Sequence, residues 1–70
     1  MEIIFTYHSV LRMKKRRVDR GEIISAIKHP DVTLKKHGKY FYQKRLLRGI
    51  IEIVCEKTEK SLNVITLYWL

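Results

Sequence analysis

The chain has 70 residues, of which 46% are hydrophobic and 31% are charged. A chain this short buries only about 60% of the surface that its unfolded form exposes, so its core is thin. The length excludes a second domain or a dinucleotide-binding unit, and the three isolated glycines exclude a glycine-rich phosphate loop. The single cysteine excludes an intramolecular disulfide. We therefore predict one domain spanning residues 1–70.

Charge is the first indication of function. Fifteen Lys and Arg outweigh seven Asp and Glu, which gives a net charge of +8. Residues 8–48 carry thirteen basic and three acidic side chains, a net charge of +10, whereas residues 49–70 have a net charge of −1. This asymmetry predicts a polyanionic partner, most simply RNA, or an acidic protein. The alternative is an ordinary solvated basic surface.

The sequence also indicates where the protein works. No apolar run reaches the length of a membrane span, and the first residues lack the long apolar region of a secretion signal. We expect a soluble cytoplasmic protein without membrane association. Ile, Lys, Arg and Glu are frequent, whereas Gln, Asn and Ala occur once each, a bias typical of heat-adapted proteins.

The first predicted helix follows a short apolar lead-in, residues 2–5. Thr6 is the expected N-cap, and the helix runs from residue 7 to Arg16 or Arg17. At 100° per residue, an apolar stripe forms on one side and a basic stripe on another. The apolar stripe comprises Tyr7, Val10 and Leu11, and the basic stripe comprises His8, Arg12, Lys15 and Arg16.

The second predicted helix begins at an N-cap, Asp19, whose partner in a capping box is Glu22. Val18 and Ile23 occupy the positions of a hydrophobic staple, and Pro30 ends the helix. The buried stripe comprises Ile23, Ile24 and Ile27. The two helices are predicted to form an N-terminal αα-hairpin.

The pattern after Pro30 changes to the alternation of strands. The predicted strands are Val32–Lys36, Lys39–Arg45, Ile50–Glu56 and Leu62–Leu70, with a turn at His37-Gly38 and a bend at Arg48-Gly49. In the last strand, alternation places Ile65, Leu67 and Trp69 on one face and Val64, Thr66 and Tyr68 on the other. We predict an α+β domain in which the αα-hairpin packs on a three- to four-stranded antiparallel β-meander.

Several residues are candidates for chemistry on a phosphate. His8 lies in the first turn of its helix, and the helix dipole and nearby Arg12 both favour a neutral imidazole, as a general base requires. The alternative is a half-exposed histidine without a role. Arg12, Lys15 and Arg16, with Arg17 and Arg20 at the turn between the helices, form a cationic patch suited to phosphate. The hydroxyls of Thr66 and Tyr68 share one strand face, although both residues are also common strand formers.

Two further groups of side chains have the chemistry of binding sites. Tyr40, Phe41 and Tyr42 alternate with basic residues, so they either stack on bases or pack within the sheet. The histidines and Cys55 lack metal-ligand spacing, so we predict no metal and no cofactor.

These segments resemble a known family. The stretches T-Y-H-S-V-L-R-M-K-K-R, V-D-R-G-E-I-I with H-P-D, G-K-Y-F-Y, I-E-I-V-C-E and V-I-T-L-Y-W resemble the family called domain of unknown function 4258 over nearly the whole chain. Arg17 stands where that family often has glycine. The family looks related to RelE-like messenger-RNA interferases, which are small metal-independent ribonuclease toxins.

The resemblance implies cleavage of RNA, free or on the ribosome, by attack of a 2′-OH on the adjacent phosphate. It implies His8 in proton transfer, Arg12 and Arg16 on the phosphate, and the last-strand hydroxyls of Thr66 and Tyr68 at the site. Arg48 is a looser candidate for a phosphate clamp. A small acidic antitoxin is the implied protein partner. The alternatives are a module of the same fold that binds RNA or an acidic partner without cleaving, and an interaction protein that has lost both roles.

Overall fold

The computed structural model describes all 70 residues. A short strand, β1 (Glu2–Phe5), is followed by two helices, α1 (Tyr7–Arg16) and α2 (Arg20–Lys28). The remaining strands are β2 (Val32–Lys36), β3 (Lys39–Leu46), β4 (Gly49–Lys57) and β5 (Ser61–Trp69). No helix is long and apolar enough to cross a membrane.

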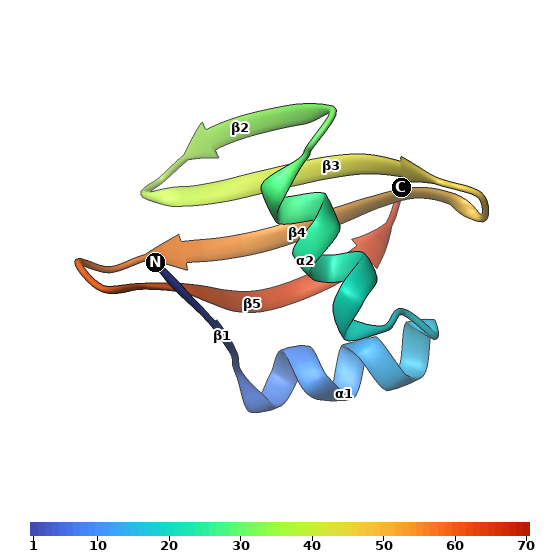
Figure 1. Cartoon of the computed structure of the whole chain (residues 1–70), viewed down its shortest axis with the longest axis horizontal. Helices are drawn as coiled ribbons and strands as arrows, with labels where there is room; N and C mark the ends of the chain where they lie inside the picture. Colours follow the sequence, from blue (N-terminus) through green and yellow to red (C-terminus); the bar gives the residue numbers. More distant parts are fainter.

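The five strands form one mixed sheet in the order β1-β5-β4-β3-β2 (Figure 1). Strands β2 to β5 pair antiparallel as predicted, but β1 pairs parallel with β5. The predicted fold, an N-terminal αα-hairpin on an antiparallel meander, is therefore wrong. The short lead-in is a strand because Ile3 and Phe5 pack on the core while Ile4 between them is 41% exposed. The helices thus follow a strand.

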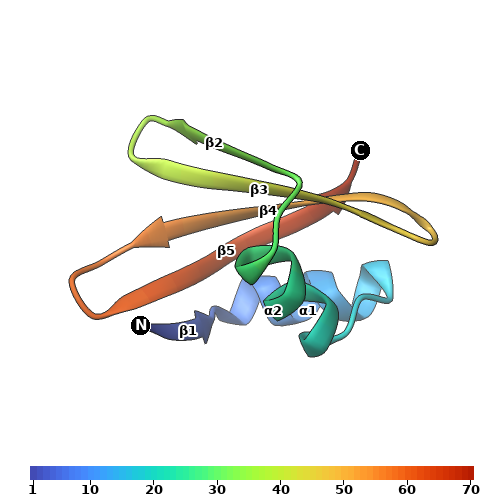
Figure 2. The same ribbon diagram turned by 45° about the horizontal axis from the view of Figure 1, so that its top comes forward.

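The helices do not form a hairpin either. α1 packs on β5, whereas α2 packs on β3 and β4. Figures 1 and 2 together show α1 beside the edge of the sheet and α2 over one of its faces. The turn between them begins at Arg17, which has φ 57° and ψ 48°. This left-handed conformation is one that glycine adopts with less strain than arginine.

Polar contacts fix α1 along β5. The Thr6 hydroxyl caps α1 by accepting a hydrogen bond from the Ser9 backbone N–H (3.2 Å), and it donates to the Val64 carbonyl (2.7 Å). At the other end, Trp69 Nε1 donates to the Arg16 carbonyl (3.3 Å). The helix therefore runs parallel to β5 from Val64 to Trp69. The Thr6 N-cap is confirmed.

The core lies between α2 and the sheet. Its buried residues are Val18, Ile23, Ala26, Ile51, Ile53, Cys55, Leu62, Val64 and Leu67. The predicted start of α2 is confirmed, since Asp19 Oδ1 accepts from the Glu22 N–H (2.8 Å) and Glu22 Oε1 accepts from the Asp19 N–H (3.1 Å). Burial of one large aliphatic side chain contributes about 1.5–3 kcal/mol, so this cluster dominates stability.

One irregularity changes the predicted faces of β5. Val54 pairs with Thr66, but Cys55 pairs with Val64, so Ile65 is an extra residue in a β-bulge. Because of the bulge, Val64 lies in the core together with Leu67. Strict alternation had placed Val64 on the other face and Ile65 with Leu67, and this prediction is wrong.

Candidate functional site

One face of the sheet is not covered by either helix (Figure 2). Pairing register places the same-side residues of this open face in rows that cross four strands. One row is Val32, Gln43, Glu52 and Tyr68, and the next is Leu34, Phe41, Val54 and Thr66. The predicted site residues Thr66 and Tyr68 therefore stand side by side with an acidic residue on the same face.

A hydrogen-bonded group occupies the centre of the open face. The Tyr68 hydroxyl donates to Glu52 Oε1 (2.5 Å), and Gln43 Nε2 donates to Glu52 Oε2 (2.6 Å). Glu52 is only 8% exposed and is the one charged side chain among the buried residues. We call Gln43, Glu52 and Tyr68 the Glu52 cluster.

The Glu52 cluster contains no positively charged side chain. The only ion pair joins Arg48 to Glu22, so two neutral donors hold the buried Glu52. Desolvating a carboxylate without a positive partner is unfavourable, and such groups concentrate at functional sites. Burial, together with the hydrogen bond to Glu52 and its charge, raises the pKa of Tyr68 to about 12. The phenol therefore stays protonated at neutral pH and donates to the carboxylate.

A second polar cluster lies on α1. His8, Leu11, Arg12 and Lys15 line a shallow hollow of about 250 Å³. Arg12 Nε donates to His8 Nε2 (3.3 Å), so Nε2 carries no proton in this arrangement.

Helix geometry sets the direction of this cluster. Ser9, which is fully buried, and Met13 face the core, while Val10 and Lys14 line a hollow shared with α2. The residues at positions 8, 12 and 15 lie on the flank of α1 opposite that hollow, about 100° from Ser9. This α1 flank (His8, Arg12 and Lys15) therefore points away from α2. No hydrogen bond joins the α1 flank to the Glu52 cluster.

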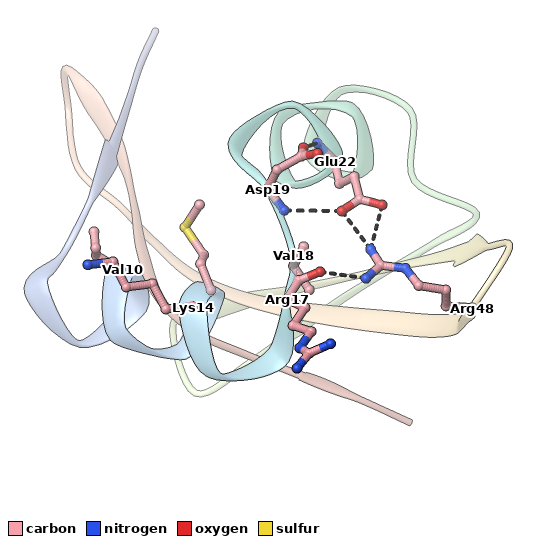
Figure 3. Close-up of a pocket in the computed structure, with 8 residues that line it drawn as sticks. Val10, Lys14, Arg17, Val18, Asp19, Glu22 and Arg48 are labelled. Carbon is pink, nitrogen blue, oxygen red and sulfur yellow. Dashed lines mark hydrogen bonds and ion pairs between the residues drawn. The ribbon is translucent and has the colours of Figure 1, made fainter.

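The other predicted cations lie elsewhere. Arg48 donates to both carboxylate oxygens of Glu22 (2.7 Å each) and to the Arg17 carbonyl, and its guanidinium lies 5.1 Å from the centre of the Trp69 ring. Figure 3 shows the contacts of Arg48 with Glu22 and with the Arg17 carbonyl, between the helix turn and the β3–β4 turn. Arg16 is exposed in the last turn of α1. The structure therefore brings together His8, Arg12 and Lys15, and separately Thr66 and Tyr68, but it holds Arg17 and Arg48 on the helix side.

Sequence reasoning missed Glu52 and Gln43. In the sequence, Glu52 alternates with Ile51 and Ile53, and nothing in its neighbours indicates that it is buried. The signal that could have found it is its pairing opposite Tyr68. That pairing depends on the register of two strands, which alternation alone does not fix.

The aromatic residues of β3 are divided between the two faces. Tyr40 and Tyr42 pair with the core residues Cys55 and Ile53, and their rings stack with centroids 6.1 Å apart. Phe41 alone lies on the open face, half-buried.

Burial raises the pKa of the Cys55 thiol to about 12, which makes it a poor nucleophile. No group of three or more metal-ligating side chains is present.

Comparison with known proteins identifies the family. The model of the family described as "Domain of unknown function (DUF4258)" matches residues 5–69. The chain belongs to this family. No curated protein and no solved structure matches it.

Proposed function

We propose that this protein binds RNA across its open face and α1 flank, and cleaves it without a metal ion by attack of a ribose 2′-OH on the adjacent phosphate. The observations that support this proposal are the buried carboxylate–phenol pair on the sheet face that neither helix covers, and the cationic α1 flank, which points away from α2. The carboxylate–phenol pair supplies a proton acceptor, and the α1 flank supplies cations for the phosphate.

The Glu52 cluster is suited to the first proton transfer, which removes the proton of the 2′-OH. The 2′-OH gives its proton to the Tyr68 oxygen as Tyr68 passes its own proton to Glu52. The 2′ oxygen forms a bond to phosphorus while the bond from phosphorus to the 5′ oxygen breaks. Because the pKa of Tyr68 is about 12, a relay through the neutral phenol is more favourable than prior formation of a phenolate.

The α1 flank fits the second transfer. When Arg12 turns to the phosphate, it releases His8 Nε2, and the negative phosphate then favours a proton on the imidazole. That proton goes to the departing 5′ oxygen. Arg12 and Lys15 stabilise the charge of the pentacovalent phosphate. The products are a 2′,3′-cyclic phosphate and a 5′-OH.

On this proposal the protein acts in the cytoplasm as a toxin of RelE-like type, on free or ribosome-bound RNA, with a small acidic antitoxin as its partner. A second candidate is an RNA-binding module that does not cleave. Both carboxylate oxygens of Glu52 are already engaged in hydrogen bonds, which favours this second candidate.

A cleavage assay separates the two candidates. Purified protein is incubated with labelled RNA in EDTA, and the products are scored for a 2′,3′-cyclic end. We expect cleavage that falls by about 10²–10⁴ in His8→Ala while affinity for RNA stays within a few-fold. Arg12→Ala should weaken both binding and cleavage. His29→Ala, an exposed histidine at the end of α2, is the matched control and should change neither.

RNA binding is tested by measuring the affinity at several salt concentrations. About five phosphate contacts give a slope of roughly −3 to −4 in the log–log plot of affinity against salt for single-stranded RNA. Binding without cleavage, on free RNA and on translating ribosomes, would leave the binding module. A salt slope near zero, or no binding at low salt, would exclude both candidates.

A further inference from the structure

The outer side of α1 is apolar and exposed. Tyr7 is 80% exposed, Leu11 47% and Val10 36%, and at spacing i, i+3 and i+4 they form one stripe that continues to Lys14. We call these four residues the outer stripe. A surface helix normally turns such a stripe to the core. Here the core side carries Ser9 and Met13 instead.

The orientation of α1 is set by its contacts with β5. Ser9 is fully buried, and its hydroxyl donates to the Thr6 carbonyl (2.7 Å), so a small side chain lies where the helix approaches the strand. The hydrogen bonds of Thr6 and Trp69 hold both ends of the helix against β5. The apolar stripe therefore cannot turn inward without breaking these contacts, and it remains available to another molecule.

The outer stripe borders a concave surface. Val10 and Lys14 lie on one side of a hollow of about 600 Å³, and Val18, Asp19, Glu22 and Arg48 lie on its other side (Figure 3). A convex apolar ridge beside a hollow between two helices has the form of a groove that accepts a helix, in which apolar anchors at i, i+3, i+4 and i+7 do the binding.

Charge selects the kind of occupant. α1 has no acidic residue. Lys14 lies within the outer stripe and Lys15 lies next to Leu11, while Arg12 and Arg16 add positive charge on the other side of the helix. A second copy of the chain would place two such helices against each other, and like charges would oppose the contact. An acidic segment is complementary. We infer that the outer stripe and its hollow are a docking site for an acidic amphipathic helix of a partner protein.

This inference does not depend on RNA cleavage, because peptide binding is measured without RNA; within the outer stripe, only Leu11 also lines the hollow that contains His8. It is tested with a labelled helical peptide of about 18 residues, since shorter helices are marginal in water. The peptide carries Leu at i, i+3, i+4 and i+7 and Glu at the flanking positions. Its counterpart with Lys in place of Glu is the charge control.

The decisive variant is Leu11→Lys. It removes an apolar anchor but raises the positive charge, so purely electrostatic binding would become tighter, whereas docking on the stripe should weaken about tenfold or more. Leu34→Lys is the matched control, because Leu34 is similarly exposed (37%) but lies on β2. We expect the Glu peptide to bind wild type and Leu34→Lys equally, and the Lys peptide to bind neither.

Other outcomes would overturn the inference. Failure of the Glu peptide to bind at about 1 mM, which corresponds to roughly −4 kcal/mol, would remove the docking site. Equal or tighter binding to Leu11→Lys would reduce it to charge attraction. A wild-type dimer that Leu11→Lys dissociates would assign the stripe to a second copy. Recruitment to phosphatidylglycerol vesicles that Leu11→Lys abolishes, without peptide binding, would assign it to a membrane surface. A circular dichroism melt establishes that each variant is folded.

Discussion

The replacement Tyr68→Phe tests whether the buried carboxylate depends on its two neutral donors. The change removes the hydroxyl that donates to Glu52 Oε1 and keeps the ring. A hydrogen bond to a charged group contributes about 1.5–3 kcal/mol, and Glu52, at 8% exposure, has little access to replacement water. A domain of this length has a total stability of roughly 3.5–10 kcal/mol, so we expect a large fraction to be lost.

Urea unfolding at neutral pH, followed by the fluorescence of Trp69, measures this loss. With a slope near 1 kcal/mol/M, the midpoint should fall by about 1.5–3 M. In a Glu52→Gln background the same change should cost only about 0.5–1.5 kcal/mol, because the bond is then neutral and Gln43 can flip its amide to match. Tyr7→Phe, at an exposed tyrosine, is the control. A Tyr68→Phe midpoint equal to that control would refute the reasoning, since Glu52 would then be solvated.

Four further predictions follow from single sites. Arg17→Gly should stabilise the fold by about 1 kcal/mol in urea unfolding, because it relieves a left-handed residue, and a loss would show that the side chain matters more than the backbone. Asp19→Ala should cost roughly 1 kcal/mol in the same assay, since the cap on the Glu22 N–H is lost; an unchanged midpoint would deny the cap a role. Ser9→Val should lower the melting temperature by overpacking at a cost of about 1–3 kcal/mol, unless α1 can move away from β5. The raised pKa of Tyr68 favours the folded state fully below pH 10 and progressively less as pH rises toward 12, so ultraviolet titration should show a late tyrosine component that is absent in Tyr68→Phe.

The sequence predicts those parts of the fold in which neighbouring residues decide the structure. The start of α2 follows from Asp19 and Glu22, which cap each other across three residues. The turn at His37-Gly38 follows from two residues that both take positive φ, 53° and 76°. In β4, Ile51 and Ile53 share one face by simple alternation, and both lie in the core. Each of these features is a local property of the chain.

The errors concern contacts between distant segments. The four residues of β1 are too few for periodicity to identify a strand, and their partner lies about sixty positions away on β5. The face of α1 is also set from outside, because β5 requires a small side chain at Ser9 and hydrogen bonds to Thr6. Hydrophobicity alone would have chosen Leu11 for the buried side.

The same reasoning explains why the centre of the candidate site could not be predicted. Up to the bulge, the register of β4 and β5 pairs Glu52 with Tyr68, and beyond it the pairing of Cys55 with Val64 is shifted by one residue. If the register of the Cys55–Val64 pair continued without the bulge, Glu52 would face Leu67 and Tyr68 would point to the core. The extra residue, Ile65, therefore lets Val64 fill the core while Tyr68 reaches the buried carboxylate. A bulge that redirects a side chain in this way is common beside functional sites, and here one inserted residue creates the pair on which the proposed chemistry depends.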